Sequence, residues 1–262
     1  MAIGIITGTG TYALPGFAHA RPRTVATRWG EADVTTGRFA GVDVVHLSRH
    51  GEGHPRLSGH VTHRANIAAL RELGVHGVLA TTACGSCDPA LGPGSLVAFD
   101  DLHFPVNRLP DGSLCTFHDT PGAAGRGHWI YGDPFCAPLR RALVEGADAA
   151  GVAVRDGGVY GHVDGPRFNT RTEVRQLTHA GVTAVSQTAG PETVLCGEAE
   201  LPFALMGFAT DYANGVAEPT PVEELVRLMG ESTDILADVL RAALARIDQP
   251  RLAPTGVVYR FD

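Results

Sequence analysis

The stretch LPFALMGFATDYANG, at residues 201–215, decides the fold of this chain. Its apolar run FALMGFA is followed abruptly by polar residues, among them Asp211. A run of this kind predicts a strand that is buried on both faces and delivers polar groups at its carboxyl end. Ligands of open α/β sheets bind at that end, so Asp211 is a candidate site residue. The alternative is that Asp211 merely caps the next turn.

Length and composition favour one α/β domain. The chain has 262 residues, of which 44% are hydrophobic, and this is enough for a single full core. Lysine and arginine number 21 against 28 aspartates and glutamates. The formal net charge of −7 argues against non-specific binding to nucleic acid or to anionic membranes. Any anionic ligand must then be held by a local pocket.

The N-terminus and the cysteines favour a soluble cytoplasmic protein. The first residues, MAIGIITG, lack a basic segment followed by a long apolar run, and no apolar run approaches membrane-spanning length. Five cysteines are an odd number in a well-cored chain, which favours reduced thiols over a disulfide framework. Cys84 and Cys87 match C-x-x-C, but no second pair completes a zinc site, so metal or redox use is the weaker hypothesis.

Glycines and polar residues follow four further predicted strands. The strands at residues 3–6, 42–47, 77–81 and 183–186 are short and apolar. They run into the turns TGTGT (7–11), SRHG (48–51), TACGS (82–86) and QTAGP (187–191). Glycines let a backbone approach a ligand and hydroxyls donate to it, although one glycine turn alone is a weak signal.

Periodicity and capping patterns predict the helices that alternate with these strands. We expect helices at residues 59–73, 133–150, 170–181 and 192–199, and a long amphipathic helix after Thr220. Thr170 with Glu173, and Thr220 with Glu223, have the spacing of a capping box. Residues 103–128 lack periodicity and are predicted to form a long functional loop.

The strand ends together carry a donor set that suits phosphate. Hydroxyls, backbone N–H groups and one bidentate guanidinium converge if the strands are neighbours. The residues concerned are Thr9, Arg49, His50, Thr82, Ala83 and Thr188. No G-x-x-x-x-G-K-[ST] motif and no convincing G-x-G-x-x-G motif is present, so a P-loop or a dinucleotide fold is not supported. Two alternatives are a surface salt bridge at Arg49 and metal binding by the nearby histidines 50, 54, 60 and 63.

The motifs resemble those of a known family. GIITGTG, SRHGEGH, HRANIAAL, TTACGS, GPRF, PETVLCGEA and FATDY occur in the order seen in the 5′-methylthioadenosine phosphorylase branch of the trimeric purine nucleoside phosphorylases. The resemblance covers residues 3–212. It implies a single domain over residues 1–262, with the mixed central sheet and flanking helices of a purine nucleoside phosphorylase-like α/β fold.

The resemblance also implies roles for individual residues. Phosphate binding is implied for Thr9, Arg49, His50, Thr82, Ala83 and Thr188. Nucleoside binding is implied for Cys84, Gly85, Phe168, Asn169, Val185, Gln187, Asp211 and Ala213, and His60 or His63 is a candidate for the 5′ region. Asp211 and His50 are the candidate catalytic residues, with Asp211 as general acid for the leaving purine. Inorganic phosphate is the implied co-substrate, and no metal or cofactor is implied.

Three departures from the family pattern bear on specificity. Thr7 replaces a glycine, Gln187 replaces a methionine beside the ribose, and Ala213 replaces an acid that accompanies 6-aminopurine preference. The leading hypothesis is phosphorolysis of 5′-methylthioadenosine or a related 5′-modified adenosine. The alternatives are the same reaction on inosine, guanosine or methylthioinosine, and a nucleoside-binding protein without catalysis.

The resemblance extends to assembly and biological role. It implies a homotrimer with the site near a subunit interface. Purine salvage is one expected role, and specialised metabolism is the alternative. The predicted long loop could reach a neighbouring subunit, and its region contains the aromatic residues Phe104, Phe117 and Trp129 as candidates for that contact.

Overall fold

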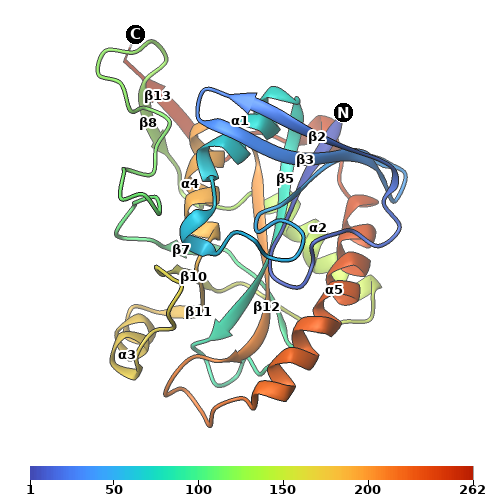
Figure 1. The fold of residues 1–262 in the computed structure, drawn as a ribbon, viewed down its shortest axis with the longest axis vertical. Coiled ribbons are helices and arrows are strands. Elements are labelled where there is room, and N and C mark those ends of the chain that lie inside the picture. Colours follow the sequence, from blue (N-terminus) through green and yellow to red (C-terminus); the bar gives the residue numbers. More distant parts are fainter. Residues whose placement is uncertain (262) are drawn as a thin grey trace.

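The apolar run that decides the fold forms the central strand β12 (Phe203–Tyr212) of a computed structural model that describes residues 1–261. β12 lies beside β5 (Val75–Ser86), and the two pair in parallel from Phe203 with Val78 to Tyr212 with Ser86 (Figure 1). Residues 203–210 are all buried. The prediction of a strand buried on both faces is confirmed.

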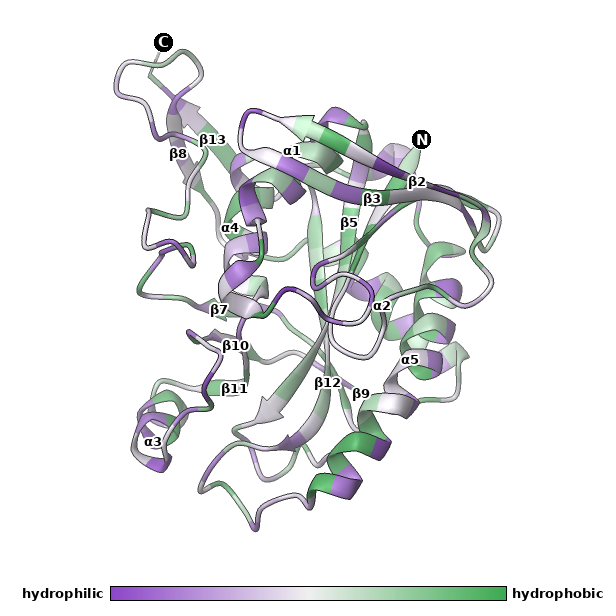
Figure 2. Cartoon of the chain, viewed as in Figure 1, coloured by the Kyte–Doolittle hydropathy of each residue, from purple (hydrophilic) through white to green (hydrophobic). Residues whose placement is uncertain are grey.

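Side chains of β12 alternate between two apolar clusters. Phe203 and Leu205 pack in the cluster that contains residues of α1 (His63–Glu72) and α4 (Ala189–Glu198). Ala204 and Met206 enter the other cluster with α2 (Ala137–Ala149) and α5 (Val222–Leu244). Successive strand residues point to opposite faces, so helices on both sides are needed to bury this strand. In Figure 2, β5 and the first part of β12 are mostly green, the colour of hydrophobic residues, whereas α5 carries both green and purple.

Within residues 1–261, eleven strands form one mixed sheet. Its order is β2-β3-β4-β1-β5-β11-β10-β7, and β12 continues from β5 to β6 and β9. A separate two-stranded ribbon pairs β8 with β13, and a further helix, α3, covers β11. The remaining bounds are β1 (Ala2–Thr7), β2 (Ala18–Thr27), β3 (Gly30–Phe39), β4 (Val42–Ser48), β6 (Leu96–Ala98), β7 (Asp101–His103), β8 (Gly127–Ile130), β9 (Val154–Asp156), β10 (Val159–His162), β11 (Val182–Ser186), β13 (Val257–Arg260), α3 (Arg171–His179) and the 3-10 turns η1 (Ser58–His60) and η2 (Gln249–Arg251).

Two strands approach β5 on the same side from opposite directions. β1 runs parallel to β5 and its pairing ends at Ile6 with Ala80, whereas β11 runs antiparallel and pairs Val185 with Gly85. β12 occupies the other side of β5 over this whole length. The carboxyl ends of β1 and β11 therefore face each other across residues 81–84 of β5. Open α/β sheets place their ligands outside the carboxyl ends of their strands, so this gap is the place to look for a site.

Several element boundaries differ from the sequence expectations. The hairpin β2–β3 was not predicted, because nearly every residue of β2 is exposed and the strand has no apolar alternation. The helix expected from residue 59 begins at His63, after η1, and the helix expected from residue 133 begins at Ala137. The long loop is shorter than expected, because β7 ends at His103 and β8 begins at Gly127.

The two predicted capping boxes have different outcomes. At α3 the Thr170 hydroxyl accepts from the Glu173 N–H and the Glu173 carboxylate accepts from the Thr170 N–H, as predicted. At α5 the prediction is wrong, because Pro221 takes the N-cap position in an extended conformation and offers no capping side chain. Glu224 of that first turn pairs with Arg227 instead.

The cysteines and the helices bear on two further expectations, namely unpaired thiols and no membrane-spanning segment. All five cysteines are buried and free, which confirms the prediction of unpaired thiols. No helix within residues 1–261 combines the length and the apolarity needed to cross a membrane.

Candidate active site

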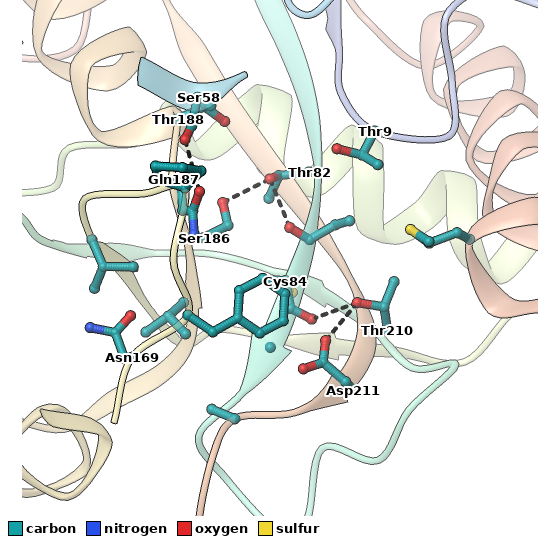
Figure 3. Close-up of a pocket in the computed structure, with 18 of the residues that line it drawn as sticks. Thr9, Ser58, Thr82, Cys84, Asn169, Ser186, Gln187, Thr188, Thr210 and Asp211 are labelled. Carbon is teal, nitrogen blue, oxygen red and sulfur yellow. Dashed lines mark hydrogen bonds between the residues drawn. The ribbon is translucent and has the colours of Figure 1, made fainter. Parts of the chain in front are cut away.

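A cavity of about 320 Å³ lies at the gap between β1 and β11 (Figure 3). Apart from His60 and His63, the structure brings together around it the residues for which sequence or resemblance implied a phosphate or nucleoside role. These residues are Thr9, Arg49, His50, Thr82, Ala83, Cys84, Gly85, Phe168, Asn169, Val185, Gln187, Thr188, Asp211 and Ala213. They converge because they follow strands whose carboxyl ends meet at this point of the sheet.

The cavity also has walls that the sequence did not reveal. Ser186 and Thr210 adjoin residues already singled out, so their places at strand ends could have indicated them. The others were not singled out as site residues, and they are His54, Leu57, Ser58, Val163, Pro166, Val174, Asn214, Leu225 and Met229. The candidates for the 5′ region do not line the cavity, because His60 is exposed and His63 is fully buried, whereas His54 lines it.

Arg49 is held by a buried ion pair. Its Nε and Nη2 donate to the two carboxylate oxygens of Glu192 at 2.7 and 2.8 Å, and its Nη1 donates to the Thr81 carbonyl at 2.8 Å. The side chains of Arg49 and Glu192 are 0% and 2% exposed, so the alternative of a surface salt bridge is wrong. A guanidinium has five N–H groups, and three are used here. One N–H on each terminal nitrogen is not used in these three bonds, and Arg49 lies in the wall of the cavity.

His50 is a neutral hydrogen-bonding group in this environment. Burial and the neighbouring Arg49 charge lower the pKa of His50 to about 4, although a hydrogen bond to the Arg56 carbonyl opposes the shift. The bond joins Nδ1 to that carbonyl at 2.7 Å, and a carbonyl only accepts, so Nδ1 carries the proton. Nε2 is then an acceptor. The His54 ring stacks on the His50 ring with centroids 4.2 Å apart.

Threonine hydroxyl groups also line the part of the cavity around Arg49 and His50. The Thr82 hydroxyl lies 2.8 Å from that of Ser186, which ties the end of β11 to β5 (Figure 3). Thr188 stands at the N-cap position of α4, but its side chain does not cap the helix and so leaves its hydroxyl to a ligand. Thr9, after β1, faces the cavity from the other side. A helix N-terminus with hydroxyls and a guanidinium around it attracts an oxyanion.

Asp211 stands at the opposite part of the cavity from Thr188 (Figure 3). Burial raises the pKa of this carboxyl, and the hydrogen bond from Thr210 opposes the shift. The Thr210 hydroxyl donates to Oδ1 at 2.8 Å, so Oδ2 is the oxygen left for a ligand or a proton. A carboxyl with a raised pKa holds its proton to higher pH, and this is what a general acid needs.

Comparison with known proteins identifies the family. A family model described as the phosphorylase superfamily matches residues 2–245. The chain belongs to the phosphorylase superfamily. The family predicted from the motifs is therefore confirmed. The matched residues include those around the cavity and most of the helices that pack on the sheet.

Relatives of this superfamily member are phosphorylases that act on purine nucleosides. A 6-oxopurine nucleoside phosphorylase, named as probable, from Thermococcus kodakarensis is 35% identical over 96% of this chain and 95% of its own. An S-methyl-5′-thioadenosine phosphorylase from Mycobacterium tuberculosis is 37% identical over 95% of this chain and 90% of its own. The methylthioadenosine phosphorylase of Schistosoma mansoni, solved with adenine, superposes with a TM-score of 0.85 and 28% identity over 94% of this chain and 91% of that one.

Proposed function

We propose that this protein cleaves the N-glycosidic bond of a purine nucleoside with inorganic phosphate, and that 5′-methylthioadenosine or a related 5′-modified adenosine is its substrate. The products are the free purine and the 5-modified ribose 1-phosphate. One observation carries the proposal: a single cavity has oxyanion donors around Arg49 and Thr188 and a carboxyl of raised pKa at Asp211. Residues 1–262 would act as one nucleoside phosphorylase domain.

The phosphate end of the cavity would bind and orient the nucleophile. Arg49 would offer two N–H groups in a plane fixed by Glu192, and the hydroxyls of Thr9 and Thr188 would add neutral donors. The Thr82 hydroxyl, which donates to the Ala83 carbonyl at 3.1 Å, would have to turn from that carbonyl to the phosphate. The neutral His50 accepts through Nε2, which suits the remaining hydroxyl of a monohydrogen phosphate. Phosphate held in this way keeps its negative charge near C1′, where positive charge develops as the glycosidic bond breaks.

The Asp211 end would stabilise the departing base. A phosphate oxygen forms the new bond to C1′ while the bond from C1′ to N9 breaks and its electron pair passes to the purine. The purine then accepts the proton of Asp211 at N7, and the carboxylate is reprotonated from solvent. Phe168, which lines the cavity near Asn169, would stack on the base. The proposed reaction uses phosphate as co-substrate and involves no further cofactor.

The phosphate requirement tests this function directly. Purified protein incubated with 5′-methylthioadenosine should release free adenine and 5-methylthioribose 1-phosphate when phosphate is present, and at most a trace of adenine when it is absent. Chromatography of the two product mixtures measures both. Equal release of adenine without phosphate would indicate a hydrolase, and no release with any purine nucleoside would refute an enzymatic role.

A second candidate is the same reaction on a 6-oxopurine nucleoside. Ala213 lines the cavity where an acid would favour a 6-amino group, and the Asn214 amide beside it is turned away to donate to the Asn169 carbonyl at 2.7 Å. The Thermococcus kodakarensis relative carries a 6-oxopurine name. Turnover of adenosine and inosine, and of their 5′-methylthio derivatives, distinguishes the candidates, because the preferred base has the higher kcat/KM.

We also propose a homotrimer, as the family resemblance implies, that works in the cytoplasm in purine salvage or in specialised metabolism. The aromatic residues that are candidates for the subunit contact are partly buried and touch rings of their own chain: Phe104 contacts His162, Phe117 contacts Trp29 and Trp129 contacts Tyr131. The β8–β13 ribbon, which projects at one corner of the molecule in Figure 1, is a better candidate. It leaves Ile130, Val257 and Tyr259 exposed, and sedimentation at the mass of a monomer would refute the trimer.

A further inference from the structure

Gln187, where the family resemblance implies a methionine, is bonded to two different loops. The Ser58 hydroxyl donates to its Oε1 at 2.8 Å (Figure 3). Its Nε2 donates to the Arg167 carbonyl at 3.1 Å. Ser58 belongs to η1, after β4, whereas Arg167 lies in the loop between β10 and α3. Because a carbonyl only accepts, the bond to Arg167 fixes which end of the amide is nitrogen. A methionine can make neither bond.

The space around this link is closely filled. A Cβ added at Gly165 would lie 1.8 Å from Gln187 Oε1 and 2.4 Å from Ser58 Oγ. The backbone of the loop before Arg167 therefore passes directly against the bonded pair. Three segments that are remote in sequence, at residues 58, 165 and 187, meet on one wall of the cavity, because Ser58 and Gln187 both line it.

The loop held by Gln187 carries Phe168, which has little packing to hold it. Its side chain is 67% exposed, although it lines the cavity. The backbone on each side of it is bonded instead: Gln187 holds the Arg167 carbonyl, and the Asn214 amide donates to the Asn169 carbonyl at 2.7 Å. An exposed ring keeps one position only if its backbone is fixed. The Phe168 carbonyl itself accepts from Arg167 Nη1 at 3.2 Å, and these three bonds anchor the backbone that carries the ring.

We propose that Gln187 is a positioning residue that clamps the η1 loop to the Arg167 loop and thereby holds Phe168 over the cavity. The proposal rests on the proposed function for its effect on nucleoside binding, but the clamp itself is a property of the free protein. On this proposal, the glutamine that stands where the resemblance implies a methionine positions the two loops and does not recognise the ribose hydroxyls.

Gln187→Met separates these two roles by kinetics. If Gln187 clamps, KM for the nucleoside rises about tenfold, kcat changes much less, and ribonucleosides and 2′-deoxyribonucleosides are affected by the same factor. Ser58→Ala should also raise KM, and in the Gln187→Met background it should add nothing, because its partner is already absent. A selective loss with the ribonucleoside would overturn the proposal in favour of direct ribose contact, and so would additive effects of the two substitutions.

Amide hydrogen exchange tests the clamp without any substrate. In Gln187→Met the peptides that cover residues 54–60 and 163–169 should exchange faster than in the wild type, while the strands keep their protection. Gln176→Met, the same substitution at an exposed position of α3, is the matched control and should leave both peptides unchanged. Unchanged exchange in Gln187→Met would refute the clamp. Loss of all turnover in the wild type would refute the proposed function and leave the exchange result valid.

Discussion

Arg49→Met should lower the free energy of unfolding by about 3–5 kcal/mol, because it leaves the Glu192 carboxylate buried without a partner. It should also raise KM for phosphate at least about 100-fold, since two charge-assisted hydrogen bonds to the anion are lost. Urea unfolding and initial rates over a range of phosphate concentrations measure the two effects. The same substitution at Arg251, whose ion pair with Asp248 is exposed, should change stability by less than about 1 kcal/mol.

A double variant separates the structural role of Arg49 from its role toward phosphate. Arg49→Met combined with Glu192→Met removes both charges, and replacing a buried pair by apolar groups of similar size restores most of the stability. The phosphate KM should stay high, because no guanidinium faces the cavity. Recovery of a normal phosphate KM in the double variant would show that Arg49 acts only through the fold.

The strand ends made most of the candidate site predictable from sequence. A buried strand has a periodicity and a polar terminus that can be read locally, and Thr82 and Asp211 each lie in the carboxyl-terminal part of such a strand. Their convergence needs only the rule that parallel strands carry their ligands at one end. The sequence did not show that β1 and β11 point at each other across β5, because β11 pairs antiparallel there.

The partners of these residues could not be predicted in the same way. Glu192 lies 143 positions after Arg49 and was interpreted only as the start of a short helix, although it fixes the plane of the guanidinium. Ser58 lies in a turn without periodicity, so nothing local indicated its bond to Gln187. Long-range hydrogen bonds depend on how elements pack, and no local pattern of side chains records that packing. The missed hairpin β2–β3 has a related cause, since an exposed strand carries no apolar signal.

Asp211→Asn should lower kcat about 10²- to 10⁴-fold with an ordinary purine nucleoside, because an amide cannot give a proton to the leaving base. The carboxyl lies in a buried position that raises its pKa, and Asn retains its size and its ability to accept from Thr210. A nucleoside methylated at N7 is the matched substrate control. Its base already carries a positive charge and leaves as a neutral group, so Asp211→Asn should affect its turnover far less. Turnover of ordinary substrates within about threefold of the wild type would remove Asp211 from the role of general acid.

The pH dependence gives an independent check on the same proton. A general acid works in its protonated form, so kcat should fall as pH rises through the pKa of Asp211, and burial moves that fall to higher pH than an exposed aspartate would show. Thr210→Val removes the one hydrogen bond that opposes this shift, so the fall should move to still higher pH. Asp211→Asn should lack it altogether. If the fall stays at the same pH in Thr210→Val and persists in Asp211→Asn, it belongs to another group, and the proton reaches the purine by a route that does not involve this strand end.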